Sequence, residues 1–166
     1  MHSVWLQGQM SDLIILKKHP EYVDDFVNVP SRIPEPMQKH RVLYWEKQFY
    51  TVKEELKQIF ADILYEEDLI DLEYVYQMRN AIAHSHISLG RNYLLFRPAR
   101  GEHQEKEIKE TFRLQPREDA ADPMILKLTF YDESRYLQDF NRIKRLDEIC
   151  FKRLSNSIGI PHSRIR

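Results

Sequence analysis

An arginine, an asparagine and two histidines stand at helical spacing near the middle of this sequence. The segment that holds them reads YQMRNAIAHSH and contains Arg79, Asn80, His84 and His86. At about 100° per residue, Asn80 and His84 lie one turn apart on the same face of a helix. Arg79 and His86 are about two turns apart and nearly aligned. The four side chains can therefore line one groove only if it is broad and the long arginine side chain reaches along it.

These residue types suit the cleavage of a phosphodiester bond in RNA. A histidine, with an ordinary pKa of about 6.5, can remove the 2′-hydroxyl proton or protonate the leaving 5′-oxygen at neutral pH. An arginine is always cationic and can hold the phosphate while stabilising the charge of the transition state. We assign these roles to His84 and Arg79, with Asn80 orienting the histidine or the phosphate. His86 is either a second acid–base group or a surface histidine, and the chemistry requires no metal and no cofactor.

The run Arg79-Asn80-Ala81-Ile82-Ala83-His84 resembles the R-x4-6-H motif of the HEPN superfamily, in which a polar residue often follows the arginine. The resemblance implies a helical bundle that acts as a metal-independent endoribonuclease on single-stranded RNA or a tRNA loop. It also implies a homodimer that brings two Arg/His sets into one cleft. Because many members are toxins or phage-defence effectors, an antitoxin or activating protein partner is a further expectation. In one toxin branch the antitoxin modifies a tyrosine two residues after the histidine, but here that residue is His86.

A second hypothesis is a non-catalytic helical bundle that binds a protein partner or RNA. In this case Arg79 is a buried ion-pair residue and His84 is a cation at the end of a helix. The near-neutral net charge of −1 favours this alternative, because a nucleic-acid enzyme often carries a strongly basic surface.

The helix that carries the motif is predicted from apolar residues at steps of three and four, namely Leu69, Leu72, Val75, Ile82 and Ala83. Continuing this stripe leads over Arg79. A charge in line with an apolar face must be paired, lie in a cleft or face a partner chain, so we do not expect Arg79 on a solvated face. The acidic run 66–68 suits the start of this helix, where the helix dipole favours negative charge, better than it suits a metal site.

The N-terminal part is expected to form a short amphipathic helix from the N-cap Ser11-Asp12, with a second piece past Pro20. Three prolines make Val29–Pro36 a loop. Apolar residues at alternating steps of three and four predict one long helix over Met37–Tyr65. The apolar face of that helix is either intramolecular core or a dimer seam.

Three strands are predicted after the motif, over 93–96, 111–114 and 125–131, with turn-rich connections at 98–107 and 115–123. They form an antiparallel β meander inserted, over approximately 89–132, between the motif helix and the C-terminal helix. Its arginines could bind phosphate and its aromatic residues could stack bases, or the aromatics could pack the sheet onto the bundle. The residues concerned are Arg91, Arg97, Arg100, Arg113, Arg117, Tyr93, Phe96 and Phe112.

A last helix is predicted over 134–157 and ends at Gly159 and Pro161. Its basic residues include Arg142 and Arg145, which we predict to contact RNA. Its stripe includes Cys150, for which a buried structural thiol is a better interpretation than a nucleophile.

The chain as a whole has 166 residues, which fits a single mainly α domain over 1–166. Residues 1–90 carry 9 basic and 14 acidic residues, whereas residues 91–166 carry 16 basic and 12 acidic ones, so the second half suits RNA better. The aliphatic run 13–16 is too short to span a membrane and the N-terminus lacks a signal pattern. We expect a cytoplasmic protein.

Overall fold

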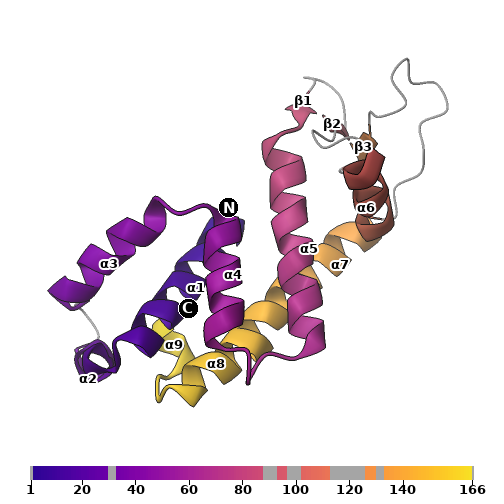
Figure 1. The fold of residues 1–166 in the computed structure, drawn as a ribbon. Coiled ribbons are helices and arrows are strands. Elements are labelled where there is room, and N and C mark those ends of the chain that lie inside the picture. The colour runs from indigo at the N-terminus through magenta and orange to yellow at the C-terminus, as the bar shows by residue number, and fades with distance from the viewer. Residues whose placement is uncertain are drawn as a thin grey trace. The chain divides into compact units, whose positions relative to one another are not determined.

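The computed structural model describes residues 2–29, 33–87, 93–96, 102–112, 126–129 and 133–165, and the chain is mainly α-helical, as predicted (Figure 1). The N-terminal elements are α1 (His2–Lys18), the 3₁₀ turn η1 (Pro20–Tyr22), α2 (Val23–Asn28), α3 (Glu35–Trp45) and α4 (Phe49–Ile59). They are followed by α5 (Glu66–Ala83), β1 (His86–Ile87), β2 (Tyr93–Phe96), α6 (Glu102–Phe112) and β3 (Leu126–Thr129). The chain then continues through α7 (Glu133–Arg145), the π-helical turn η2 (Leu146–Phe151), α8 (Lys152–Ser157) and α9 (His162–Ile165).

The chain divides into two compact units. The first unit comprises Met1–Glu73 and Asn141–Arg166, and the second comprises Tyr74–Phe140. The predicted insertion over 89–132 lies within the second unit, which also takes in the C-terminal part of α5 and the first part of α7. The candidate site residues up to His86 therefore belong to the second unit.

Helix α1 begins much earlier than the sequence predicted. Ser11 and Asp12, predicted as an N-cap, are buried in the interior of the helix. The Ser11 hydroxyl donates to the Gln7 carbonyl oxygen at 2.8 Å, and the Asp12 carboxylate accepts hydrogen bonds from Arg41. Both side chains therefore find their partners inside the fold, so they are not needed as caps. The predicted break at Pro20 is confirmed, because η1 starts there.

The long helix predicted over Met37–Tyr65 is wrong, because α3 and α4 are separate helices. The chain leaves the helix at Glu46–Gln48, and Gln48 has an extended backbone with φ −66° and ψ 148°. No proline or glycine signals this break, and the apolar spacing happens to continue across it. The apolar residues that were predicted to share one face differ in burial: Val52 and Leu56 of α4 are buried, whereas Trp45 of α3 is 72% exposed. The predicted loop before α3 is shorter than expected, and its residues 30–32 lie outside the described part.

The core of the first unit forms where α1 packs against α4 (Figure 1). Met10 and Leu13 of α1 are fully buried, as are Leu56 of α4 and Leu154 of α8. The predicted C-terminal helix is confirmed, since α7, η2 and α8 follow one another without a break. It ends at Gly159, whose φ of 75° is a left-handed conformation that glycine adopts without strain.

The second unit contains a three-stranded antiparallel sheet in the order β1-β2-β3. The strands predicted over 93–96 and 125–131 are confirmed in β2 and β3, within the described residues. The strand predicted over 111–114 is wrong: Thr111 and Phe112 belong to α6, which also replaces part of the turn-rich stretch 98–107. Ile108 and Phe112, one turn apart on α6, are both buried, and this pairing stabilises a helix there. The sheet is therefore not a simple meander, because a helix connects β2 to β3.

Candidate functional site

The N-terminus of α5 is fixed by its acidic residues. Glu66, Glu67 and Asp68 occupy the first turn, as predicted from the helix dipole. The Asp68 carboxylate also accepts a hydrogen bond from the Tyr65 backbone N–H at 2.8 Å and so closes the start of the helix. This end of α5 belongs to the first unit, whereas the motif lies toward its other end.

The buried face of α5 in the second unit is formed by Tyr74, Met78 and Ala81 rather than by the predicted stripe. These residues pack in a core cluster with Leu94, Phe96, Ile108 and Phe112. Of the predicted stripe, Leu72 and Val75 are buried, but Leu69 and Ile82 are exposed. Arg79 is exposed in the single chain, so the structure rejects only a buried ion pair, whereas a cleft or a partner chain around Arg79 stays a prediction. The reason for the exposure is that α6 and β2 cover the side of α5 next to Arg79.

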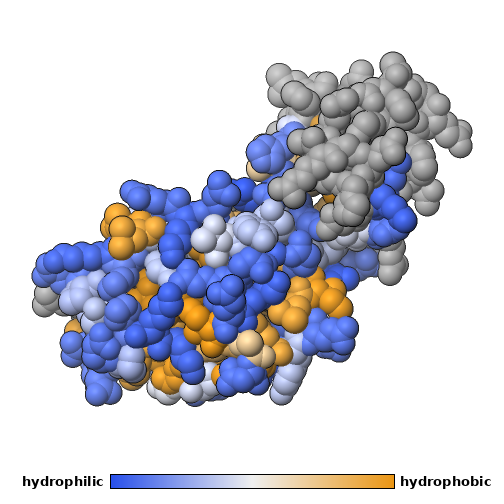
Figure 2. Space-filling view, viewed as in Figure 1, coloured by the Kyte–Doolittle hydropathy of each residue, from blue (hydrophilic) through white to orange (hydrophobic). Residues whose placement is uncertain are grey.

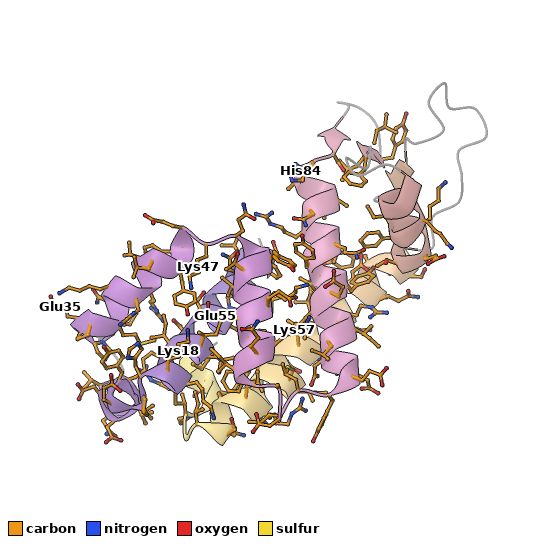
Figure 3. All side chains as sticks on the ribbon, viewed as in Figure 1. Lys18, Glu35, Lys47, Glu55, Lys57 and His84 are labelled. Carbon is orange, nitrogen blue, oxygen red and sulfur yellow. The ribbon has the colours of Figure 1, made fainter. Side chains whose placement is uncertain are left out.

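Arg79, Asn80 and His84 lie close together in sequence at the C-terminal end of α5. Arg79 Nη1 donates to Asn80 Oδ1 at 3.1 Å, so the asparagine orients the guanidinium rather than the histidine. The His84 backbone N–H donates to the Asn80 carbonyl oxygen at 3.0 Å, which continues the helical turn. Figure 3 shows His84 where α5 gives way to the chain leading to β1, and its side chain is exposed. A guanidinium and an imidazole are thus both open to a ligand from solvent.

Arg79 differs from the other arginine side chains that the structure describes. Arg41, Arg142, Arg145 and Arg153 all contact carboxylates. Arg164 donates to the backbone carbonyl oxygen of Phe26. Within the described part of the chain, Arg79 alone has a guanidinium bound only to a neutral side chain. Its charge is therefore not committed to the fold.

His86 does not continue the motif helix. It begins β1, where it pairs with Leu95, because α5 ends at Ala83 and not near Leu89-Gly90 as predicted. The helical alignment of His86 with Arg79 is therefore wrong.

The predicted RNA contacts of the insertion have mixed outcomes. The arginines assigned to it lie outside the described residues, namely Arg91, Arg97, Arg100, Arg113 and Arg117. Tyr93, Phe96 and Phe112 are described, and each is at most 9% exposed. Base stacking by these three aromatic residues is therefore wrong, and the alternative of packing within the fold is confirmed.

Arg142 and Arg145 are bound into an ion-pair network instead of lying free for RNA. Arg142 Nη1 is 2.5 Å from Asp71 Oδ1, and Arg145 Nε is 2.6 Å from Asp71 Oδ2. Arg145 Nη1 also lies 3.1 Å from Asp68 Oδ1, and Arg153 contacts the other oxygen of Asp68. The network joins the first part of α5 to α7 and α8 within the first unit. Sequence reasoning missed it because its partners are more than 70 residues apart.

Cys150 is a buried structural thiol, as predicted. It is fully buried on η2, and burial, with a smaller contribution from the nearby Asp68 carboxylate, raises its thiol pKa to about 12. A nucleophilic cysteine needs a lowered pKa, so a nucleophilic role for this residue is excluded at neutral pH.

A second charge cluster lies between α1 and α4 and includes Lys18, Lys47 and Glu55, which Figure 3 labels. Tyr44 also donates to Glu55 Oε1 at 2.7 Å. Burial would raise the pKa of Glu55, but the hydrogen bonds from both lysines and Tyr44 lower it to about 2. The three donors satisfy the carboxylate, so this cluster stabilises the fold and offers no free acid–base group.

Among the described residues, no group of three or more histidine, cysteine, aspartate and glutamate side chains could hold a metal ion. No described helix is both long and apolar enough to cross a membrane. Comparison of the chain with protein-family models, with curated proteins and with solved structures found no match.

Proposed function

We propose that this chain is a metal-independent endoribonuclease of the HEPN type that cleaves single-stranded RNA or tRNA loops. The observation that carries the proposal is the uncommitted charge of Arg79, beside an exposed histidine on the same helix end. The resemblance of the run from Arg79 to His84 to the R-x4-6-H motif supports it independently.

The proposed reaction uses the 2′-hydroxyl of the substrate as nucleophile. His84 takes the hydroxyl proton, the 2′-oxygen attacks phosphorus, and the bond from phosphorus to the 5′-oxygen breaks. The leaving 5′-oxygen receives a proton, and the products are a 2′,3′-cyclic phosphate and a 5′-hydroxyl. Arg79, oriented by Asn80, holds the non-bridging oxygens as their negative charge grows.

The reaction needs a base and an acid, but one chain supplies only one of the assigned groups, His84. A homodimer that places two copies of the motif in one cleft would supply both, and we include it in the proposal. The exposure of Arg79 and His84 in the single chain is compatible with such a cleft. A role as a toxin or phage-defence effector in the cytoplasm, controlled by an antitoxin or activating protein, completes the proposal.

The test is an RNA cleavage assay in EDTA with the purified full chain. Wild type should cleave single-stranded RNA or tRNA to cyclic-phosphate ends and should leave the 2′-deoxy substrate intact. His84→Ala should slow cleavage about 10²–10⁴-fold, and Arg79→Ala about 10²–10³-fold. Lys39→Ala is the control, because it removes an exposed positive charge from α3. Full cleavage by both motif variants would show that the site assignment is wrong.

The alternative is a non-catalytic module that binds a protein partner or RNA. It is favoured by the apolar side chains that reach the surface, among them Leu43 at 58% and Trp45 at 72% exposure. On the face shown in Figure 2, apolar residues lie among the charged ones. Intact RNA with every substrate, from a protein whose dimer has been verified by light scattering, would favour this alternative.

A further inference from the structure

A cavity of about 290 Å³ lies within the first unit, and no residue of the motif lines it. Its lining comes from the first half of α1, the end of α3 and Ile165 of α9. Gln7 Nε2 of α1 donates a hydrogen bond of 3.0 Å to the carbonyl oxygen of Lys47, which follows α3. This bond links α1 to the end of α3. The cavity is therefore a feature of one compact unit.

Gly8 keeps this cavity open. It lies in the interior of α1, where glycine is a poor helix former, and it does not have the positive φ that would require glycine. A Cβ atom at this position would meet no other atom within 4 Å. Neither backbone conformation nor close packing explains the glycine, but the missing side chain leaves room in the cavity.

The aromatic part of the lining consists of Trp5 and Trp45. They are the two tryptophans of the chain. Trp45 is 72% exposed, a large apolar surface for a side chain that the fold does not use in its core. Indole rings offer flat faces on which other flat rings stack.

The polar part of the lining has no net charge but retains hydrogen-bonding groups. Arg41 binds the Asp12 carboxylate through Nε, at 2.6 Å, and through Nη2, so the two charges neutralise each other. In the described part of the chain, Nη1 of Arg41 has no partner. Gln9 donates from Nε2 to Asp147 Oδ1 at 3.1 Å, whereas its Oε1 is buried without a partner. The Nη1 donor of Arg41 thus remains at the cavity, whereas Gln9 Oε1 is enclosed within the fold.

We propose that this cavity binds a nucleobase, stacked on the tryptophans and hydrogen-bonded along its edge to Arg41. A nucleobase is flat and uncharged and carries acceptors along its edge, which matches the indole rings and the free Nη1 donor of the lining. A phosphate or carboxylate ligand fits less well, because Asp12 cancels the charge of Arg41. The volume is at the low end of the roughly 300–1,000 Å³ typical of ligand pockets, so it suits one base or nucleoside.

The base could belong to a free nucleotide or to single-stranded RNA, and the chemistry of the cavity is the same for both. The proposal does not depend on the ribonuclease activity, since no motif residue lines the cavity. The two sources are separated by comparing the four ribonucleoside 5′-monophosphates with a single-stranded oligoribonucleotide. Ribose 5-phosphate is the control without a base.

Tryptophan fluorescence of the full chain is a direct readout, because both tryptophans line the cavity. At least one nucleotide or the oligonucleotide should change the emission in a saturable way, and calorimetry should give the same affinity. Ribose 5-phosphate should change nothing. Absence of saturable binding by every nucleotide and the oligonucleotide, or equal binding of ribose 5-phosphate, would overturn the proposal.

Two substitutions at one position test the location. Gly8→Leu fills the cavity with a good helix former and should weaken binding by about tenfold or more, whereas Gly8→Ala should retain most of it. Circular dichroism establishes that both variants fold. If Gly8→Leu does not fold, Trp45→Ala replaces it, because this exposed side chain is not needed by the core. Unchanged calorimetric affinity in the folded variant would show that the cavity is not the site.

Discussion

Asp68 is the residue on which the ion-pair network of the first unit depends most. Its side chain is fully buried, and its carboxylate meets Arg145 Nη1 at 3.1 Å, Arg153, and the Tyr65 backbone N–H at 2.8 Å. The substitution Asp68→Asn keeps the shape and one acceptor oxygen but removes the charge. Two guanidinium groups then face a neutral amide.

Removing one partner of a buried ion pair costs about 3–5 kcal/mol, because the remaining charge is buried without compensation. Arg145 and Arg153 keep 25% and 23% of their side-chain surfaces exposed and can regain some hydration. Arg145 also keeps Asp71 as a partner, 2.6 Å away. We therefore expect the lower end, a loss of about 3 kcal/mol in unfolding free energy. For a chain of this size the loss corresponds to a decrease of roughly 6–12 °C in melting temperature.

Urea unfolding followed by tryptophan fluorescence measures this loss, because Trp5 and Trp45 both lie in the first unit. Urea is preferable to guanidinium, whose ions screen the network. Glu67→Gln is the matched control: Glu67 is 84% exposed and lies 3.7 Å from Arg145, so its loss should cost at most about 0.5 kcal/mol. An Asp68→Asn protein as stable as wild type, or an equal cost in both variants, would refute the role given to burial.

Three further predictions concern the first unit. Because hydrogen bonds lower the pKa of Glu55 from 4.5 to about 2, its contribution is present above the unfolded value and is lost as pH falls toward 2. When the pH is lowered from 5 to 2, Glu55→Gln should therefore lose about 1–2 kcal/mol less unfolding free energy than wild type. The difference stays this small because Lys18 is exposed and solvent screens its charge. Cys150, with its pKa raised to about 12, should resist thiol reagents at pH 8 in native protein and react once urea unfolds it. Gly159→Ala should lower the unfolding free energy by about 1 kcal/mol, measured by urea titration, because alanine is strained at a φ of 75°.

The sequence predicts those parts of the fold whose signals are local. The break at Pro20 and the end of the C-terminal helix at Gly159 depend on residues that restrict or free their own backbone, and both are confirmed. The break at Glu46–Gln48 depends instead on tertiary packing, since its residues could all continue a helix. Periodicity alone therefore joined α3 and α4 into one helix.

The network around Asp68 and Asp71 could not be predicted for a different reason. Arg142 and Arg145 looked like part of a basic helix surface, and their partners lie more than 70 residues earlier in the chain. A sequence shows the number of charges on a helix, but pairing over this separation follows from the fold. The same limit applies to the lining of the cavity, where Arg41 of α3 meets Asp12 of α1.

The candidate site shows the two limits together. The helical period correctly puts Arg79 and Asn80 on α5, with His84 in the turn that follows it, because their spacing is local. The side of that helix that is buried depends on α6 and β2, which pack against Tyr74 and Ala81. The argument that Arg79 continues an apolar stripe toward a partner chain stays a prediction, because exposure in a single chain does not test what covers Arg79 in a dimer. The proposed reaction also argues for a dimer, because it requires a proton acceptor and a proton donor while each chain supplies one assigned histidine, His84, at the end of α5.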